Sequence, residues 1–132
     1  MANINGTYLL EKNEGYEEWL LALGAPAETS KKMTLSKPKL EVKINATTQV
    51  SVTNIATAPP FNNTILLGQE SKTKMPTGAE LTANISVVGD CLKGTAVIGD
   101  KKMDVLFQFS PEGLVTTVNM GPICSKRTYK RV

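Results

Sequence analysis

The sequence predicts a mostly β protein, an antiparallel barrel of about ten short strands with a small helical segment at one end. Three observations lead to this expectation. Apolar and polar residues alternate with a period of two from residue 39 onward, turn signals separate the alternating runs, and a single helical region lies near the start. Because a sheet of that many strands normally closes to hide its edges, we expect a closed up-and-down barrel.

The helical region follows a first strand at residues 5–12. Its apolar side chains recur at the spacing i, i+3, i+4 and i+7 of a helix face: Tyr16, Trp19, Leu20 and Leu23. Gly24 is typical of a helix end, and residues 27–35 predict a second short helix that Pro38 ends. Trp19 is expected to pack these helices on the barrel.

The strands of the remaining chain are half-buried. Residues 39–44 place Leu40, Val42 and Ile44 opposite three charged residues, as one apolar and one polar face require. The further expected strands are residues 47–56, 63–68, 71–75, 79–88, 91–98, 101–109, 113–120 and 122–131. Short turns between consecutive strands predict antiparallel neighbours.

Size and composition predict one domain that contains a cavity. The chain has 132 residues, of which 41% are hydrophobic and 20% charged, so residues 1–132 form a single globular domain. A barrel of about ten strands is wider than side chains alone can fill. Only 5% of the residues are aromatic, and we therefore expect an internal cavity.

Charge and residue usage exclude several functions. A net charge of +3, spread along the chain, lacks the dense basic stripe of nucleic-acid-binding proteins. Histidine is absent, and no nucleophile with a base can be assembled, so we expect no enzyme, no metal site and no cofactor. The first 19 residues lack the pattern of a secretory signal, and no apolar stretch is long enough to span a membrane, which favours a cytoplasmic monomer. Cys91 and Cys124 are interpreted as buried free thiols.

Residues 6–23 resemble the signature of the intracellular fatty-acid-binding protein family, within the lipocalin-like superfamily. The matching elements are Gly6, Tyr8 and Leu10, then residues 15–17 and the apolar run that includes Trp19. Residues 59–70 resemble a strand-turn-strand segment with a portal phenylalanine, here Phe61, and residues 127–132 resemble a C-terminal Arg-x-Tyr. The resemblance implies a ten-stranded antiparallel β-barrel (a β-clam) with a helix-turn-helix lid and a cavity for long-chain fatty acids.

The Arg-x-Tyr pair is the predicted anchor of the ligand carboxylate. Arg127 and Tyr129 lie two apart, and so on one face of the last strand, together with Ser125 and Arg131. The resemblance implies that Arg127 and Tyr129 point into the barrel and bind the carboxylate. A guanidinium stays charged when it is desolvated, and a phenol adds one donor. Alternation alone would equally allow Arg127 on the surface.

Phe107 occupies the position of a second inward arginine in many members of the family. Its neighbours Val105 and Phe109 share its face, which predicts an apolar wall, and Gln108 should point outward. Three alternatives follow. The carboxylate binds Arg127 and Tyr129 alone, with or without water; it turns toward the portal; or the ligand is a weakly polar lipid such as an alcohol, a retinoid or a monoacylglycerol. We favour the first.

The predicted ligand contacts include residues of the lid and portal. Tyr16 and Met33, one on each expected helix, and Phe61 join the contacts named above. Lys31 and Lys32 of the second helix are the expected point of transient contact with anionic membranes, although two lysines in a helix are usually only solvated. A non-binding interaction protein on the same barrel is the remaining alternative, and it would leave Arg127 and Tyr129 without a role.

Overall fold

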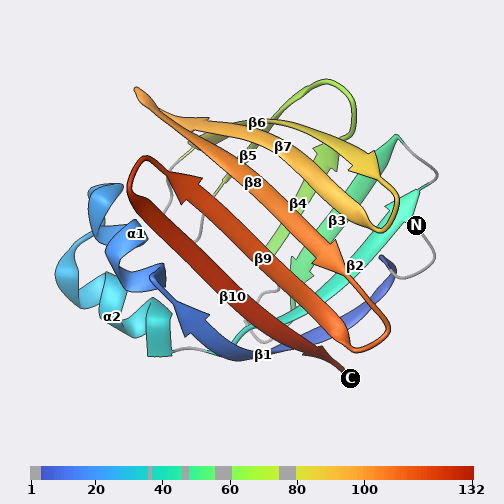
Figure 1. The fold of residues 1–132 in the computed structure, drawn as a ribbon, viewed down its shortest axis with the longest axis horizontal. Helices are drawn as coiled ribbons and strands as arrows, with labels where there is room; N and C mark the ends of the chain where they lie inside the picture. The colour runs from blue at the N-terminus through green and yellow to red at the C-terminus, as the bar shows by residue number, and fades with distance from the viewer. Residues whose placement is uncertain (1–3, 36, 46–47, 56–60, 75–79) are drawn as a thin grey trace.

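Ten strands and two helices make up the part of the chain that the structure describes (Figure 1). This computed structural model describes residues 4–35, 37–45, 48–55, 61–74 and 80–132, with only the backbone of Phe61. The elements in chain order are β1 (Gly6–Glu14), α1 (Tyr16–Ala22), α2 (Ala27–Leu35), β2 (Lys39–Asn45), β3 (Gln49–Asn54), β4 (Phe61–Leu66), β5 (Glu70–Lys74), β6 (Glu80–Val88), β7 (Cys91–Ile98), β8 (Lys101–Phe109), β9 (Gly113–Met120) and β10 (Ile123–Arg131).

The strands form one antiparallel sheet in the order β4-β3-β2-β1-β10-β9-β8-β7-β6-β5. The two helices lie together at one end of the curved sheet, while the C-terminus lies at the other (Figure 1). This arrangement confirms the predicted up-and-down barrel with a helix-turn-helix lid. None of the described helices has the length and apolar character needed to cross a membrane.

The barrel is nearly closed, because its edge strands β4 and β5 are joined by side chains and not by a ladder. The amide of Asn63 on β4 donates to the backbone carbonyl of Lys74 on β5 at 2.8 Å and accepts from the Lys74 N–H at 3.2 Å. A third bond runs from the Leu66 N–H to Ser71 Oγ at 3.3 Å. One carboxamide thus imitates the paired donor and acceptor of a strand at this seam.

A β-bulge divides β1. The strand pairs with β2 over Gly6–Leu9 and with β10 over Tyr8–Glu14, and its register on β10 shifts between Leu10 and Lys12. Such a bulge bends the strand and changes which face the following side chains occupy. Beyond the bulge Asn13, not Lys12, stands on the inner face opposite Arg127.

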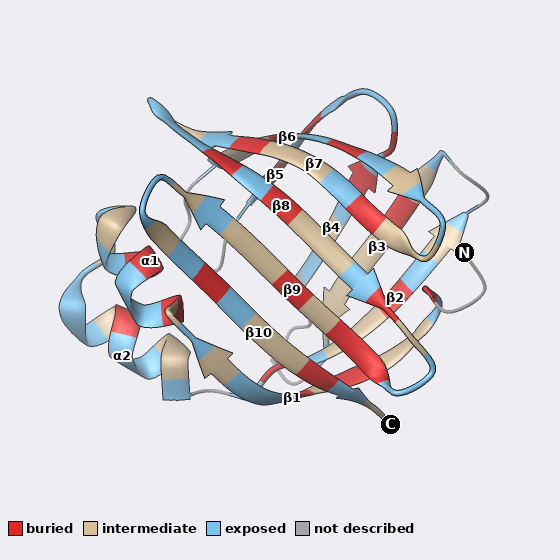
Figure 2. Ribbon diagram, viewed as in Figure 1, coloured by how far each residue is buried: buried red, intermediate tan, exposed pale blue. Residues whose placement is uncertain are grey.

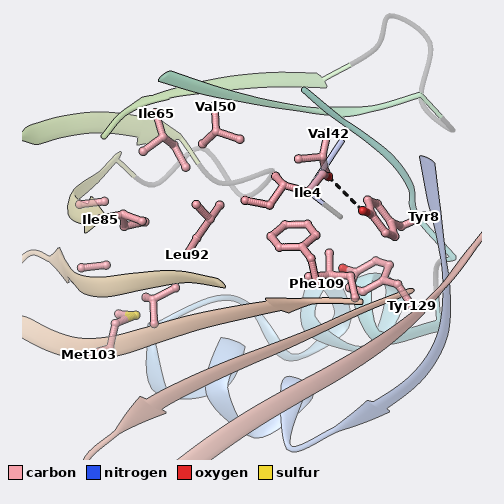
Figure 3. Close-up of a cluster of buried hydrophobic side chains, with 14 of the residues drawn as sticks. Ile4, Tyr8, Val42, Val50, Ile65, Ile85, Leu92, Met103, Phe109 and Tyr129 are labelled. Carbon is pink, nitrogen blue, oxygen red and sulfur yellow. Dashed lines mark hydrogen bonds between the residues drawn. The ribbon is translucent and has the colours of Figure 1, made fainter. Parts of the chain in front are cut away.

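The core lies inside the barrel and under the lid. Burial alternates along the strands, and α1 turns Tyr16, Trp19 and Leu20 inward (Figure 2), as their spacing predicted. At the end of β1 far from the helices, Tyr8 packs edge-on against Phe109 with ring centroids 5.6 Å apart. The Tyr8 hydroxyl donates to the Ile4 carbonyl at 2.9 Å (Figure 3). Buried side chains therefore fill this end of the barrel.

Arg131 closes the same end. Its Nη1 donates to the Asn5 carbonyl at 3.0 Å, and its Nη2 donates to the Tyr8 hydroxyl at 2.9 Å and to the Ser110 carbonyl at 3.0 Å. A Cβ on Gly6 would collide with Nη1 of this guanidinium, so a larger residue there would force the arginine side chain to shift. Three segments of the chain are thus held together by one side chain.

The lid is attached to the barrel through polar contacts as well as apolar ones. Asn13 Nδ2 donates to the Thr34 carbonyl in α2 at 2.9 Å, and Lys101 Nζ donates to the Ala22 carbonyl at the end of α1. Gly15 joins β1 to α1 with a φ of 70°, and a Cβ there would collide with the carbonyl of Cys124. These contacts fix where α1 meets β10.

The expectation of two buried thiols was wrong. Cys124 is exposed and Cys91 is half-buried. Cys124 alternates with Ser125 on β10 and so shares the outer face with Lys126 and Lys130, which are also exposed. The alternation of β10 therefore determines the exposure of Cys124, and the apolar character of the thiol does not.

Candidate functional site

The inner face of β10 carries a polar row. Ser125 and Tyr129 are buried, Arg127 is half-buried between them, and the intervening Lys126 and Lys130 are exposed. Arg127 stands opposite Asn13 on β1 and opposite Thr116 on β9. The predicted inward position of Arg127 and Tyr129 is therefore what the structure has.

The guanidinium of Arg127 is held on two sides. Its Nε donates to Asn13 Oδ1 at 2.8 Å, and its Cζ lies 3.8 Å from the ring centroid of Tyr16 and 5.7 Å from that of Tyr129. Stacking on an aromatic face stabilises a cation that has lost water. No ion pair between described residues includes Arg127. Its positive charge therefore has no carboxylate partner in the described part of the chain.

Both tyrosines of the site remain protonated at neutral pH. Burial raises the pKa of Tyr129, the charge and hydrogen bond of Arg127 oppose that rise, and the nearby Tyr16 adds to it. Burial likewise raises the pKa of Tyr16, and Arg127 again lowers it. A neutral phenol can donate to a bound anion, which a phenolate cannot.

A cavity of about 250 Å³ lies between this row and the lid. Its apolar lining comes from both sides of the barrel and from α1: Trp19, Leu40, Val52, Ile65, Leu81, Phe107 and Val118. Its polar and phenolic lining consists of Tyr16, Asn63, Thr73, Lys74, Thr116, Ser125, Arg127 and Tyr129. The cavity can accommodate an apolar chain with an anionic group at Arg127.

A second, wider depression of about 470 Å³ lies over residues 5–7 and 41–44. It opens broadly to solvent, and no aromatic residue lines it. An apolar ligand there would remain largely in contact with water and gain little from burial. The internal cavity is therefore the better binding site, although it is smaller.

The structure brings together only some of the predicted ligand contacts. Phe107, Arg127, Tyr129 and Tyr16 line the cavity. Phe109 (Figure 3) and Val105 are buried in the core, and Met33 packs against it, but none of these three is among the described lining residues. The side chain of Phe61 lies outside the described residues. Gln108 is exposed, as predicted.

Several residues of the site were not among the predicted ligand contacts, including Thr116 and Trp19 in the cavity wall and Asn13, which binds Arg127 but does not line the cavity. Asn13 was hidden by the bulge in β1, because simple alternation from Tyr8 places it outside. Thr116 shares the inner face of β9 with Leu114, so the alternation along this strand could have predicted its inward position. Trp19, assigned to packing alone, is buried and also lines the cavity. No three His, Cys, Asp or Glu side chains of the described residues are grouped as a metal site would require.

Comparisons with known proteins agree with this geometry. No protein-family model matches the chain. It is 28% identical over 134 residues to a fatty acid-binding protein of Tyrophagus putrescentiae, covering 99% of each chain. It is 30% identical over 132 residues to fatty acid-binding protein homolog 5 of Caenorhabditis elegans, covering 96% of this chain and 94% of the relative.

A solved structure shares the fold. The fatty acid binding protein of Schistosoma mansoni, in complex with arachidonic acid, matches 100% of this chain and 98% of its own with a TM-score of 0.90. The two sequences are 18% identical, so this likeness establishes the architecture alone.

Proposed function

Because the chain belongs to the fatty-acid-binding protein family, we propose that its barrel binds and transports long-chain fatty acids in the cytoplasm, as a monomer. The ligand carboxylate binds Arg127 and Tyr129. The observation that carries this proposal is a guanidinium in the cavity wall without a carboxylate partner among the described residues. Burying a cation in this way is costly unless an anion joins it.

The contacts of Arg127 support a carboxylate as that anion. Asn13 uses the Nε donor, and Tyr16 covers one face of the guanidinium. The two terminal nitrogens remain available for a planar, doubly accepting group, and the phenol of Tyr129 can donate beside them. The head group thus meets donors that already have fixed positions.

The apolar lining supplies most of the affinity. Each buried methylene contributes about 0.8 kcal/mol, so a chain of about 15 methylenes gains roughly 12 kcal/mol before the costs of association. The cavity of about 250 Å³ is smaller than the roughly 300–1,000 Å³ of common ligand sites. A long chain must therefore displace part of the lid, which is where Trp19 and Tyr16 line the cavity.

The test compares oleate with methyl oleate in the wild type and in Arg127→Met. Arg127→Met removes the cation and keeps an apolar side chain, so the preference for the acid should fall about 10- to 100-fold, while ester affinity changes little. Lys130→Met is the control, because Lys130 is exposed on the same strand. An unchanged acid-to-ester ratio in Arg127→Met contradicts the anchor. Equal binding of both ligands by the wild type would favour a weakly polar lipid instead.

Membrane contact through the lid is a further part of the proposal. Lys31 and Lys32 are exposed on α2, Leu35 is 73% exposed beside them, and Lys32 makes only a solvent-exposed ion pair with Glu28 at 3.9 Å. Basic and apolar side chains together favour an anionic lipid surface. Transfer of a fluorescent fatty acid to phosphatidylserine vesicles should slow with added salt and in Lys31→Ala/Lys32→Ala. A transfer rate independent of both changes contradicts this contact.

A further inference from the structure

Three buried residues with a hydroxyl line the cavity, Thr73 on β5, Thr116 on β9 and Ser125 on β10, and the last two lie beside Arg127. Thr116 is 7% exposed and Ser125 is 3% exposed, and both line the cavity. Neither side chain makes a hydrogen bond with another of the described residues. A buried hydroxyl without a partner is costly, so such groups normally face water or a ligand.

Sheet register places both hydroxyl-bearing residues next to the anchor. Thr116 on β9 is the direct partner of Arg127, and Ser125 precedes Arg127 by two residues on the same face of β10. Directly opposite residues on one face have Cβ atoms about 5 Å apart, and the diagonal neighbours are somewhat farther. The two hydroxyls and the guanidinium thus form one compact polar area on β9 and β10.

The surroundings of this area are apolar on one side. Phe107 on β8 is the next residue across from Thr116, so the polar area ends at β9. On the lid side, Trp19 is 8% exposed and its indole N–H also lacks a hydrogen-bond partner within the described residues. Near its carboxylate, a ligand can therefore place an additional oxygen toward β9, β10 and α1, whereas the polar lining of β4 and β5 belongs to strands that do not pair with β10.

We propose that the preferred ligand is a long-chain acid with a hydroxyl on carbon 2 or 3, which Thr116 and Ser125 bind while Arg127 holds the carboxylate. This inference rests on the proposed function. The fork of Arg127 and the phenol of Tyr129 together fill three of the roughly four acceptor positions of a carboxylate, so at least one of the two hydroxyls is left for another ligand group. A neighbouring ligand hydroxyl both donates and accepts, and so do the side chains of Thr116 and Ser125. Carbons 2 and 3 are the only chain positions near enough to the carboxylate to reach them.

The same geometry predicts a preference between mirror images. With the carboxylate on Arg127 and the chain in the cavity, a hydroxyl on carbon 2 points toward Thr116 and Ser125 in one enantiomer and away from them in the other. The second enantiomer would bury its hydroxyl without a partner. We expect the wild type to distinguish the two enantiomers of 2-hydroxypalmitate.

The experiment measures dissociation constants of palmitate and of each 2-hydroxypalmitate enantiomer by calorimetry. The wild type should bind one enantiomer about tenfold more tightly than palmitate or the other enantiomer, as expected for one or two neutral hydrogen bonds that otherwise go to water. Thr116→Val keeps the shape and removes the hydroxyl, so it should abolish both preferences, each measured as a ratio of dissociation constants within the same variant. Thr117→Val is the matched control, because Thr117 is the next residue and faces the other side of β9.

Each outcome separates this inference from the proposed function. If palmitate does not bind, the proposed fatty-acid binding fails and the inference fails with it. If palmitate binds as tightly as both enantiomers, the hydroxyls hold only water and this inference alone is overturned. A preference that persists in Thr116→Val and in Ser125→Ala also overturns it, because the ligand hydroxyl then binds elsewhere.

Discussion

Arg127 and Arg131 lie on the same face of β10 but differ in what their guanidinium groups contact. Arg131 donates to the Asn5 and Ser110 carbonyls and to the Tyr8 hydroxyl, so its terminal nitrogens are occupied at the end of the barrel away from the helices. Arg127, four residues earlier, donates from Nε to Asn13, lies over the ring of Tyr16 and interacts with the phenol of Tyr129. One guanidinium holds segments of the chain together, and the other keeps its terminal donors for something outside the chain.

The number of hydrogen-bond acceptors that the chain supplies to the guanidinium distinguishes a structural arginine from a binding one. Residue type and burial do not. Both arginines are half-buried, and both lie over a tyrosine ring, Arg127 at 3.8 Å from Tyr16 and Arg131 at 4.9 Å from Tyr8. At Arg131 three residues, Asn5, Tyr8 and Ser110, supply oxygen atoms. At Arg127 the described residues supply only the amide oxygen of Asn13 and the phenol of Tyr129, and the cavity lies on the remaining side.

Replacing each arginine by methionine should separate the two roles most clearly. Arg131→Met should lower the free energy of unfolding by about 2 to 4 kcal/mol, because it leaves acceptors at the end of the barrel without their donor. Arg127→Met should change it by less than about 1 kcal/mol, since it loses one hydrogen bond and an unpaired cation. Urea unfolding of the ligand-free variants measures both. A larger loss in Arg127→Met than in Arg131→Met would contradict the comparison.

Asn13→Asp should make Arg127 resemble Arg131. The substitution is nearly isosteric and puts a carboxylate against the guanidinium, where Asn13 Oδ1 now lies 2.8 Å from Nε. An internal anion then competes with the ligand, so the oleate-to-methyl-oleate preference should fall about 10- to 100-fold. Fluorescent displacement measures the ratio. Asn13→Ser is the control, because it shortens the side chain without adding charge, and its ratio should fall much less. Retained acid preference in Asn13→Asp would show that the head group binds away from Arg127.

The tyrosines beside the two arginines should give the smallest effect, visible only in alkali. The chain has three tyrosines, and burial raises the pKa of each above its usual value of 10.0, with Arg131 or Arg127 opposing the rise. Above pH 10 the unfolded chain releases these protons and the folded chain keeps them. Stability should therefore be unaffected by the tyrosines below pH 10 and fall as pH rises further.

Absorbance at the tyrosinate band measures this directly. Ionisation should coincide with loss of structure, and in Arg127→Met it should start at higher pH, because the cation that lowers the pKa of Tyr16 and Tyr129 is gone. Ionisation of a tyrosine near pH 10 in the intact fold would contradict the burial that the structure assigns to these rings.

The fold followed from the sequence more completely than the site did. The period-two runs predicted the strands, and the helical spacing of residues 16–23 predicted the buried face of α1, because these patterns are local. The resemblance to the family, and not alternation alone, predicted Arg127 and Tyr129 inside, while alternation placed Phe107 on one face with Val105 and Phe109. Alternation could not tell that Val105 and Phe109 lie in packed core while Phe107 lines the cavity, since that depends on where along the barrel side chains meet.

The bulge in β1 explains why the sequence did not predict Asn13 as a residue of the site. One extra residue reverses which of the following side chains face inward, and no pattern in residues 10–13 predicts this bulge. Asn13 was therefore not predicted as a site residue, although its hydrogen bond orients Arg127. Register shifts of this kind depend on pairing with a distant strand, here β10, and only the assembled sheet reveals them.

The carboxamide of Asn63 makes the seam between β4 and β5 sensitive to chemical ageing. Asparagine is among the residues that hydrolyse with age and heat. Conversion to aspartate would remove the donor to the Lys74 carbonyl, which is one of three hydrogen bonds across the seam, and a less protected strand edge can pair with other molecules. Old or heated preparations should therefore begin to associate at this seam before the nine ladders elsewhere in the described sheet give way.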